Sequence, residues 1–194
     1  MENKVYKNIT AIILAGGKSS RMKQDKGLVM LNGKMMVEYI LDKAKMFTDK
    51  IIIITNSDEY NQFGFPCYAD MIKDSGPMGG IYTGLANSTT QKNLVLSCDA
   101  PFVSEKVLTE LIKQTNDEDV LVAAHDEKIE PLCAVYDLKC KDFFKQWIEN
   151  VELKMMDALQ KLNTVKVNFT ENELKNSFAN INTPEDLAKH QNKS

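Results

Sequence analysis

The stretch that decides the fold is Ile9-Thr-Ala-Ile-Ile-Leu14, an apolar run rich in β-branched residues that ends at Gly16-Gly17. Such a run, closed by turn residues, predicts a strand buried on both faces. Outward from it, apolar side chains recur every three or four positions from Met36 to Phe47, which predicts an amphipathic helix. Ile51–Ile54 repeats the character of the first run, and a third buried strand is expected over Asn93–Cys98. Strand and helix therefore alternate along this half of the chain.

The rest of the chain continues the alternation. Its patterns predict helices over residues 78–87, 104–114, 143–150 and 153–162, and strands over residues 120–124, 132–136 and 164–169. Three glycines weaken the first of these helices, whereas Ser104 is a good N-cap for the second. A last helix has a strong start signal, because Thr183 can cap it, Pro184 suits its first turn and Asp186 completes a capping box. We therefore predict a single three-layer, Rossmann-like α/β domain over residues 1–194, with helices on both faces of a mainly parallel sheet.

Composition excludes several classes of protein. The chain has 194 residues, and its 24 basic and 27 acidic side chains give a net charge of −3, which lacks the basic footprint of a nucleic-acid-binding protein. No apolar stretch approaches the length of a membrane helix, and no signal peptide is evident, so we expect a cytoplasmic protein. The four cysteines form no CxxC pair and the chain has two histidines, which is poor material for a zinc site.

Ligands of open α/β sheets bind beyond the carboxyl ends of the strands, so the loops after the first three strands are the places to look. The loop after Leu14 has two adjacent glycines, whose backbone N–H groups can approach an anion, followed by Lys18, Arg21 and Lys26. That composition suits a polyphosphate, although a solvated basic turn has the same composition. Neither the P-loop nor the dinucleotide-binding spacing of glycines is present.

Other candidates are ambiguous when each is taken alone. Asp99 directly follows the third strand and could hold Mg²⁺, but an aspartate before proline is more often a turn residue. Asn56 follows the second strand, where capping a helix is the more common role than reading a base. Asp70 carries no signal by itself. His125 fits a loop residue better than a catalytic base, and Glu130-Pro131 fits an ordinary entry into a strand.

Five segments together resemble a known family. The loop Leu14-Ala-Gly-Gly-x-Ser-x-Arg-Met-x-x-Asp-Lys26 resembles the signature of nucleotidyltransferases, and the rest of the chain is similar to the molybdenum cofactor guanylyltransferase family. The other four segments follow in the family's order: Gly76-Pro-Met-Gly-Gly-Ile81, Cys98-Asp-Ala-Pro101, Glu130-Pro-Leu-Cys-Ala-Val-Tyr136 and Asn180-Ile-Asn-Thr-Pro-Glu-Asp-Leu187. One departure is Lys23, which stands where the family usually has glycine and adds a cation to the loop.

The resemblance implies a nucleotidyltransferase fold with a mixed, mainly parallel sheet, a GTP-binding half over roughly residues 1–105 and a pterin-side half over roughly residues 106–194. It implies catalytic roles for Arg21, Lys26 and Asp99, with Asp99 binding Mg²⁺. The implied nucleotide-binding residues are Leu14, Ala15, Gly16, Gly17, Lys26, Asn56, Asp70 and Asp99. The implied pterin-side residues are Gly79, Glu130, Pro131, Asn180 and Asn182.

The implied reaction is transfer of GMP from GTP to the phosphate of molybdopterin or the molybdenum cofactor, with release of pyrophosphate. Its partners would be these two substrates and possible chaperones of molybdoenzymes or other proteins of cofactor synthesis, with no nucleic acid and no membrane. Two alternatives stay open. One is a related nucleotidyltransferase that uses CTP or a sugar phosphate, against which Gly17 argues, since cytidylyltransferase relatives resemble Leu-Ala-Ala-Gly here. The other is an adaptor that binds a nucleotide without turnover.

Overall fold

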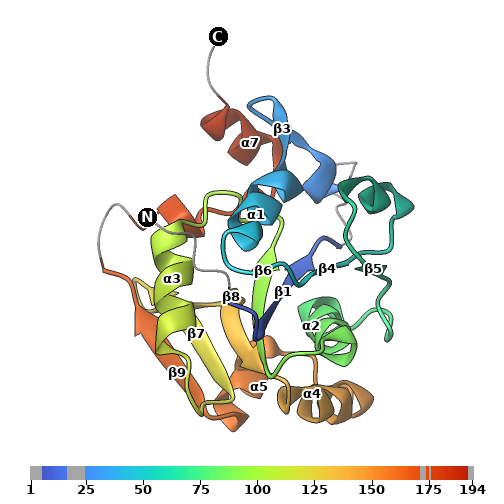
Figure 1. Cartoon of the computed structure of the whole chain (residues 1–194), viewed down its shortest axis with the longest axis vertical. Coiled ribbons are helices and arrows are strands. Elements are labelled where there is room, and N and C mark those ends of the chain that lie inside the picture. The colour runs from blue at the N-terminus through green and yellow to red at the C-terminus, as the bar shows by residue number, and fades with distance from the viewer. Residues whose placement is uncertain (1–5, 17–24, 171–173, 175, 192–194) are drawn as a thin grey trace.

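The structure is a computed structural model of the chain, and it describes residues 6–16, 25–170, 174 and 176–191. Within these residues seven strands form one mixed sheet in the order β5-β4-β1-β6-β8-β7-β9 (Figure 1). Their bounds are β1 (Ile9–Leu14), β4 (Ile51–Ile54), β5 (Cys67–Tyr68), β6 (Lys92–Ser97), β7 (Val120–His125), β8 (Lys128–Asp137) and β9 (Thr164–Asn168). Neighbouring strands are parallel except where β8 pairs with β6 and with β7. The predicted mixed, mainly parallel sheet is confirmed.

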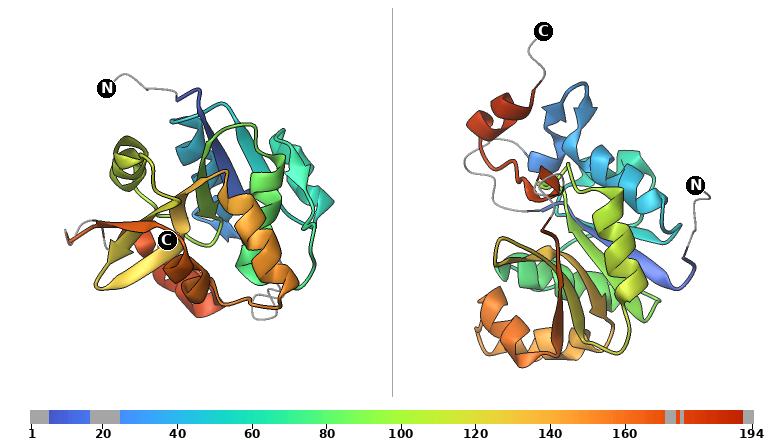
Figure 2. Two further views of the ribbon diagram at one scale, coloured as in Figure 1. Left: turned by 90° about the horizontal axis from the view of Figure 1, so that it is seen from below. Right: turned by 90° about the vertical axis from the view of Figure 1, so that its left-hand side faces the viewer.

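Helices cover both faces of the sheet, so the predicted three layers are confirmed (Figures 1 and 2). Helices α1 (Met36–Lys45) and α3 (Glu105–Gln114) pack on one face, in a core that includes Ile13 of β1. Helices α2 (Gly76–Asn87), α4 (Cys140–Glu149) and α5 (Met155–Lys161) pack on the other face, in a core that includes Ile12. Because both faces are covered, every residue of β1 is buried, as its continuous apolar run predicts.

A third, smaller cluster lies beyond the carboxyl edge of the sheet. The hairpin of β2 (Met30–Leu31) and β3 (Lys34–Met35) packs there against α7 (Pro184–His190), which lies beside it at the top of Figure 1. Short 3-10 helices complete the fold: η1 (Lys26–Leu28), η2 (Asp58–Phe63) and η3 (Asn176–Phe178). No helix in the described part of the chain is long and apolar enough to cross a membrane.

Local signals for the helix ends are confirmed. The Ser104 hydroxyl accepts a hydrogen bond from the N–H of Val107, and Thr183 and Asp186 form the expected capping box of α7. One capping prediction is wrong. Ser57, rather than Asn56, caps η2, because the side-chain oxygen of Asn56 already accepts a hydrogen bond from the backbone N–H of Asp70.

The most consequential difference from the predicted elements is in β8, which begins at Lys128, four residues before the predicted strand. Its pairing with β7 jumps from Val122 opposite Ala134 to Ala123 opposite Glu130. Residues 131–133 therefore bulge out of this ladder, and Pro131, which has no N–H, belongs to the bulge. The prediction that His125 is a loop residue is wrong, because His125 is the last residue of β7 and pairs with Lys128 across the hairpin.

The glycines that weaken α2 as a predicted helix let it approach β1 closely. A Cβ atom on Gly84 would stand 2.4 Å from Ile12 Cγ2, in the buried core. We expect Gly84→Ala to lower the free energy of unfolding by about 1–3 kcal/mol in a urea titration, the usual cost of overpacking. Gly16→Ala is the control, because the nearest atom that its Cβ would meet among the described residues is Ile54 O, at 3.8 Å. Equal urea midpoints for the two variants would contradict the prediction.

Candidate active site

The site is built where parallel strands end together. Hydrogen bonds tie the first residues beyond the strands to their neighbours: Cys98 N to Leu14 O at 3.1 Å, Ala15 N to Ile54 O at 2.9 Å, and Thr55 N to Tyr68 O at 2.9 Å. The loops after β1, β4, β5 and β6 therefore start side by side. This is the edge at which the sequence predicts the ligands.

A small cavity of about 90 Å³ lies at this edge. It is lined by Ala15, Gly16, Asp25, Lys26, Ser97, Cys98 and Asp99. The structure thus brings together four residues predicted for the nucleotide, namely Ala15, Gly16, Lys26 and Asp99. Gly17, Lys18, Arg21 and Lys23 lie outside the described residues.

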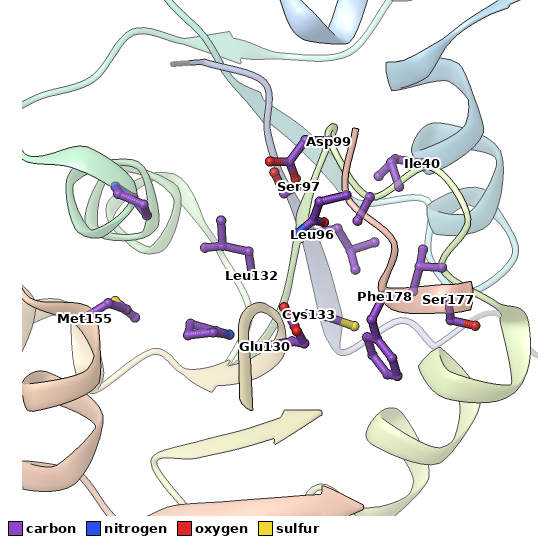
Figure 3. Close-up of a pocket in the computed structure, with 15 residues that line it drawn as sticks. Ile40, Leu96, Ser97, Asp99, Glu130, Leu132, Cys133, Met155, Ser177 and Phe178 are labelled. Carbon is purple, nitrogen blue, oxygen red and sulfur yellow. The ribbon is translucent and has the colours of Figure 1, made fainter. Parts of the chain in front are cut away.

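A larger cavity of about 250 Å³ adjoins the first and shares Ser97 and Asp99 with it. In Figure 3, Asp99 and Ser97 lie at one end of this cavity and Glu130 at the other, with Leu132 between them. The bulge of β8 explains this placement, because it moves Pro131 and Leu132 out of the ladder with β7 and into the cavity wall. The predicted pterin-side residues Glu130, Pro131 and Asn180 therefore line one cavity.

Asp99 occupies the junction of the two cavities. It is half-buried in the turn that follows β6, where Ala100 N donates to Ser97 O at 3.3 Å. Its backbone oxygen accepts a hydrogen bond from Ile181 N at 2.8 Å, which brings the segment before α7 against the turn. The backbone thus places the carboxylate where it faces both spaces.

Lys26 reaches the same region from η1. Its ammonium donates a hydrogen bond to Asn182 Oδ1 at 2.6 Å, although the two residues are 156 positions apart in the sequence. The backbone N–H of Asn182 in turn donates to Asp186 Oδ2 at 3.2 Å, so the capping box of α7 also holds Asn182. A lysine predicted for the nucleotide and an asparagine predicted for the pterin side are therefore in direct contact.

Asn56 and Asp70 form a reciprocal pair beside the cavities. The Asn56 amide donates to Asp70 Oδ2 at 3.1 Å, and the N–H of Asp70 donates back to Asn56 Oδ1 at 3.2 Å. Gly80 lies against this pair, since a Cβ there would stand 3.8 Å from Asp70 Oδ1 and 3.2 Å from Leu14 Cδ2. The pair therefore flanks the end of β1, and neither of its residues is among those that line the two cavities.

Gly79 and Leu14 are both buried, and neither lines one of the two cavities. A Cβ on Gly79 would stand 2.9 Å from Ser75 Cβ and 3.1 Å from Ile72 O, so the absence of a side chain there serves packing at the start of α2. Pro77 of the same helix lines the larger cavity in its place.

Sequence reasoning missed the far wall of the larger cavity. Glu130 Oε1 lies 2.8 Å from His125 Nε2, and the His125 ring stacks on Phe178 of η3 with centroids 4.4 Å apart. Ser177 and Phe178 both line the cavity, and so does Met155. No motif marks Met155, Ser177 or Phe178. A signal did exist for Ser97, which ends a buried strand at the ligand edge.

The thiols in the cavity walls are held neutral. Burial raises the pKa of Cys133 to about 12, and burial, followed by the nearby Asp99 carboxylate, raises that of Cys98 further still. A thiol with so high a pKa is protonated at neutral pH and is a poor nucleophile. Among the residues that the structure describes, the charged groups that line the small cavity are Asp25, Lys26 and Asp99.

No group of three or more His, Cys, Asp or Glu side chains that could hold a metal ion occurs in the described ranges. Mg²⁺ does not need such a group, since it binds through one or two carboxylates, water and substrate phosphates. Asp25 and Asp99 both line the small cavity, so its donor set fits a magnesium ion that arrives with a polyphosphate.

A three-layer α/β fold with a glycine loop, a lysine and an aspartate at the carboxyl edge of its sheet defines an α/β nucleotidyltransferase. A CMP:2-keto-3-deoxy-manno-octonic acid synthetase solved with CTP has the same fold, with a TM-score of 0.72 and 14% identity, and the match covers 94% of this chain and 96% of that one. The crystal structure of molybdopterin-guanine dinucleotide biosynthesis protein A from Archaeoglobus fulgidus matches with a TM-score of 0.78 and 28% identity, over 94% of this chain and 96% of that one.

The family is narrower than this class. Residues 11–165 match the model of the MobA-like NTP transferase domain, and the chain belongs to that family. A relative from Flavobacterium johnsoniae is 42% identical over 92% of this chain and 94% of its own length. That relative is described as a probable molybdenum cofactor guanylyltransferase.

Proposed function

We propose that this protein transfers GMP from GTP to the terminal phosphate of molybdopterin or the molybdenum cofactor and releases pyrophosphate. One observation carries the proposal: two adjoining cavities share Ser97 and Asp99, as a site that joins two substrates requires. The descriptions of the bacterial and archaeal relatives supply the identity of the substrates. The proposal is supported by Ala15, Gly16 and Lys26, which line the small cavity, and by Glu130, Pro131 and Asn180, which line the larger one.

The small cavity takes the triphosphate. The backbone at Ala15 and Gly16, with Gly17 beside them in the sequence, approaches the nucleotide without side chains between. Lys26 neutralises the phosphates, and Arg21 adds a second charge from the same loop. Asn56 and Asp70 contact the nucleoside, for which their reciprocal hydrogen bonds already fix the orientation of both side chains.

Mg²⁺ is the proposed metal ion, held by Asp99 together with the phosphates of GTP. When bound, it supplies positive charge to the transferring and leaving phosphates. Asp99 lies between the cavities, so one carboxylate serves the atoms that react from both sides. One carboxylate oxygen of Asp25 already accepts hydrogen bonds from Gly27 N and from the Tyr60 hydroxyl. We therefore propose Asp99 as the principal ligand.

The larger cavity takes the pterin substrate, with Glu130, Pro131 and Asn180 in its wall. Asn182, which accepts a hydrogen bond from Lys26, and Gly79, in the same helix as the cavity residue Pro77, belong to the same proposed side of the site. An oxygen of the acceptor phosphate attacks the α-phosphorus of GTP, and the bond from that phosphorus to the β-bridging oxygen breaks. Pyrophosphate leaves with the electron pair. A phosphate acceptor is already ionised at pH 7, so the chain has to supply position and charge rather than a general base.

A pyrophosphate-release assay with GTP, Mg²⁺ and molybdopterin tests the function. We expect release that depends on both substrates, and a product that contains GMP joined to molybdopterin. Release with CTP or a sugar phosphate instead would assign the chain to another nucleotidyltransferase. Nucleotide binding without release under any of these conditions would assign it to an adaptor.

Base choice is a separate prediction. We expect calorimetry to show that the protein binds GTP more tightly than CTP or ATP by about tenfold to a hundredfold, because each hydrogen-bonding group left unpaired by the wrong base costs about 1–3 kcal/mol. Asp70→Ala should remove much of this preference, since it also releases Asn56. Equal affinity of the unaltered protein for GTP and CTP would contradict the prediction.

A further inference from the structure

The turn that carries Lys26 is held in place by hydrogen bonds to the side chain of Asp25. Asp25 is the N-cap of η1, and its Oδ1 atom accepts a hydrogen bond from Gly27 N at 3.0 Å. The same oxygen accepts a hydrogen bond from the hydroxyl of Tyr60, which lies 35 positions further along the chain in η2. One carboxylate oxygen therefore joins the turn to a side chain from a different part of the fold.

Tyr60 is well suited to fix the position of this turn. Its side chain is fully buried, and its ring packs against Phe63 with centroids 5.9 Å apart. Burial raises the pKa of Tyr60 above its ordinary value, so the phenol is protonated and can donate a hydrogen bond at neutral pH. A buried donor without an acceptor costs free energy, so the Tyr60 hydroxyl strongly favours the position of the turn in which it bonds to Asp25.

Packing fixes the turn as tightly as the hydrogen bonds do. A Cβ atom on Gly27 would stand 2.2 Å from the Tyr60 hydroxyl oxygen and 3.3 Å from Cys98 Sγ. Gly27 therefore lies directly on Tyr60 and on the residue that precedes Asp99. The distance between the Lys26 backbone and the Asp99 turn is set by this contact.

We propose that Tyr60 is a positioning residue for the transferase reaction: through Asp25 and Gly27 it holds η1 so that the Lys26 ammonium meets the transferring phosphates. The inference rests on the proposed function, and in that reaction Tyr60 touches neither substrate. Its hydroxyl donates a hydrogen bond to the turn at Asp25, whereas its ring packs in the hydrophobic core. Catalysis by positioned charge is sensitive to displacements of the order of 1 Å, which can cost about a hundredfold.

Tyr60→Phe separates the two parts, because phenylalanine keeps the ring and removes the hydroxyl. We expect this variant to lower kcat for pyrophosphate release about tenfold. In a Lys26→Ala background the same change should lower kcat less than twofold, because the group that Tyr60 positions is absent. A purely structural role predicts an equal loss in both backgrounds. Equal losses would overturn the proposal.

Tyr39→Phe is the matched control. Its hydroxyl donates to Leu31 O at 2.7 Å, so this variant also loses one tyrosine hydrogen bond, in the neighbouring hairpin region. We expect its kcat to stay within about twofold of the unaltered protein. A loss as large as that of Tyr60→Phe would mean that any loosened hydrogen bond slows the enzyme, and would also overturn the proposal.

Two variants at Asp25 keep the proposal testable if Tyr60→Phe does not fold. Asparagine retains a side-chain oxygen that accepts from Gly27 N and from Tyr60, whereas alanine removes it. We expect Asp25→Asn to retain most of the activity that Asp25→Ala loses. Equal loss in the two variants would exclude a positioning role for the hydrogen bonds to Asp25.

Failure of the proposed function is distinguishable from failure of this inference. The function fails if the unaltered protein releases no pyrophosphate from GTP with molybdopterin. The affinity of the four proteins (unaltered, Tyr60→Phe, Lys26→Ala and the double variant) for Mg²⁺-GTP, measured by calorimetry, then decides the role of Tyr60. Weaker binding caused by Tyr60→Phe only where Lys26 is present supports the positioning role, and independent effects refute it.

Discussion

Asp99→Asn is expected to leave the protein folded and to lower Mg²⁺-dependent pyrophosphate release from GTP by roughly a hundredfold to ten-thousandfold. A metal ion contributes several kcal/mol of charge stabilisation in the transition state, and each 1.4 kcal/mol changes the rate about tenfold. A neutral amide oxygen is a much weaker ligand for Mg²⁺ than a carboxylate. Asparagine nevertheless serves turns as well as aspartate does, and the bond from Ile181 N goes to the backbone of residue 99.

Asp49→Asn provides the control for Asp99. Asp49 is exposed and precedes β4 at the amino end of the strand, away from the edge that carries the cavities. Its variant should release pyrophosphate at an unchanged rate. Thermal melts of each protein with and without Mg²⁺-GTP complete the test, since the Asp99 variant should lose the stabilisation that Mg²⁺ adds to GTP. An Asp99→Asn protein that stays active and responsive to Mg²⁺ would remove this residue from the site.

Lys26→Ala is expected to lower turnover at saturating GTP by about a hundredfold to a thousandfold, the usual loss when one preorganised charge is removed from a transition state. Lys26 lines the small cavity, and its ammonium donates a hydrogen bond to Asn182 Oδ1 at 2.6 Å. A triphosphate offers that ammonium stronger, charged acceptors. GTP binding should weaken as well, but the fall in kcat is the result that identifies a role in the chemical step.

Lys50→Ala is the matched control for Lys26, because Lys50 is exposed and lies at the amino end of β4. Its kcat should equal that of the unaltered protein. Retention of turnover within about threefold in the Lys26 variant would mean that η1 is only a turn. Asn182→Ala separates the two contacts of Lys26, because it removes the hydrogen bond to Asn182 and leaves the phosphates of GTP as partners.

Local patterns in the chain were sufficient for the layers of the fold. Burial of a strand on both faces requires a continuous apolar run, so β1, β4 and β6 could be located from composition within one or two residues. Helix ends were accurate where the cap is made by neighbours in sequence, as at Ser104 and Thr183. The same locality explains why the motifs at strand ends could be expected to lie together at one edge of the sheet.

Pairings between distant segments were decided only by the tertiary structure. Periodicity reports which face is buried, but it contains no information about the partner strand, so neither the antiparallel course of β8 nor its bulge at residues 131–133 could be inferred. The two-residue strands β2, β3 and β5 are too short for any periodic signal.

The candidate site divides in the same way. The sequence by itself determined which residues carry charge and which loops they occupy, because loop chemistry follows from residue type and from the strand before it. The contacts of Lys26 with Asn182 and of Asp25 with Tyr60 join segments that are far apart in the chain. Such contacts depend on how the strands are ordered and how closely helices pack on them, and no local pattern encodes either. Only the folded chain therefore decided that one aspartate, Asp99, faces both cavities.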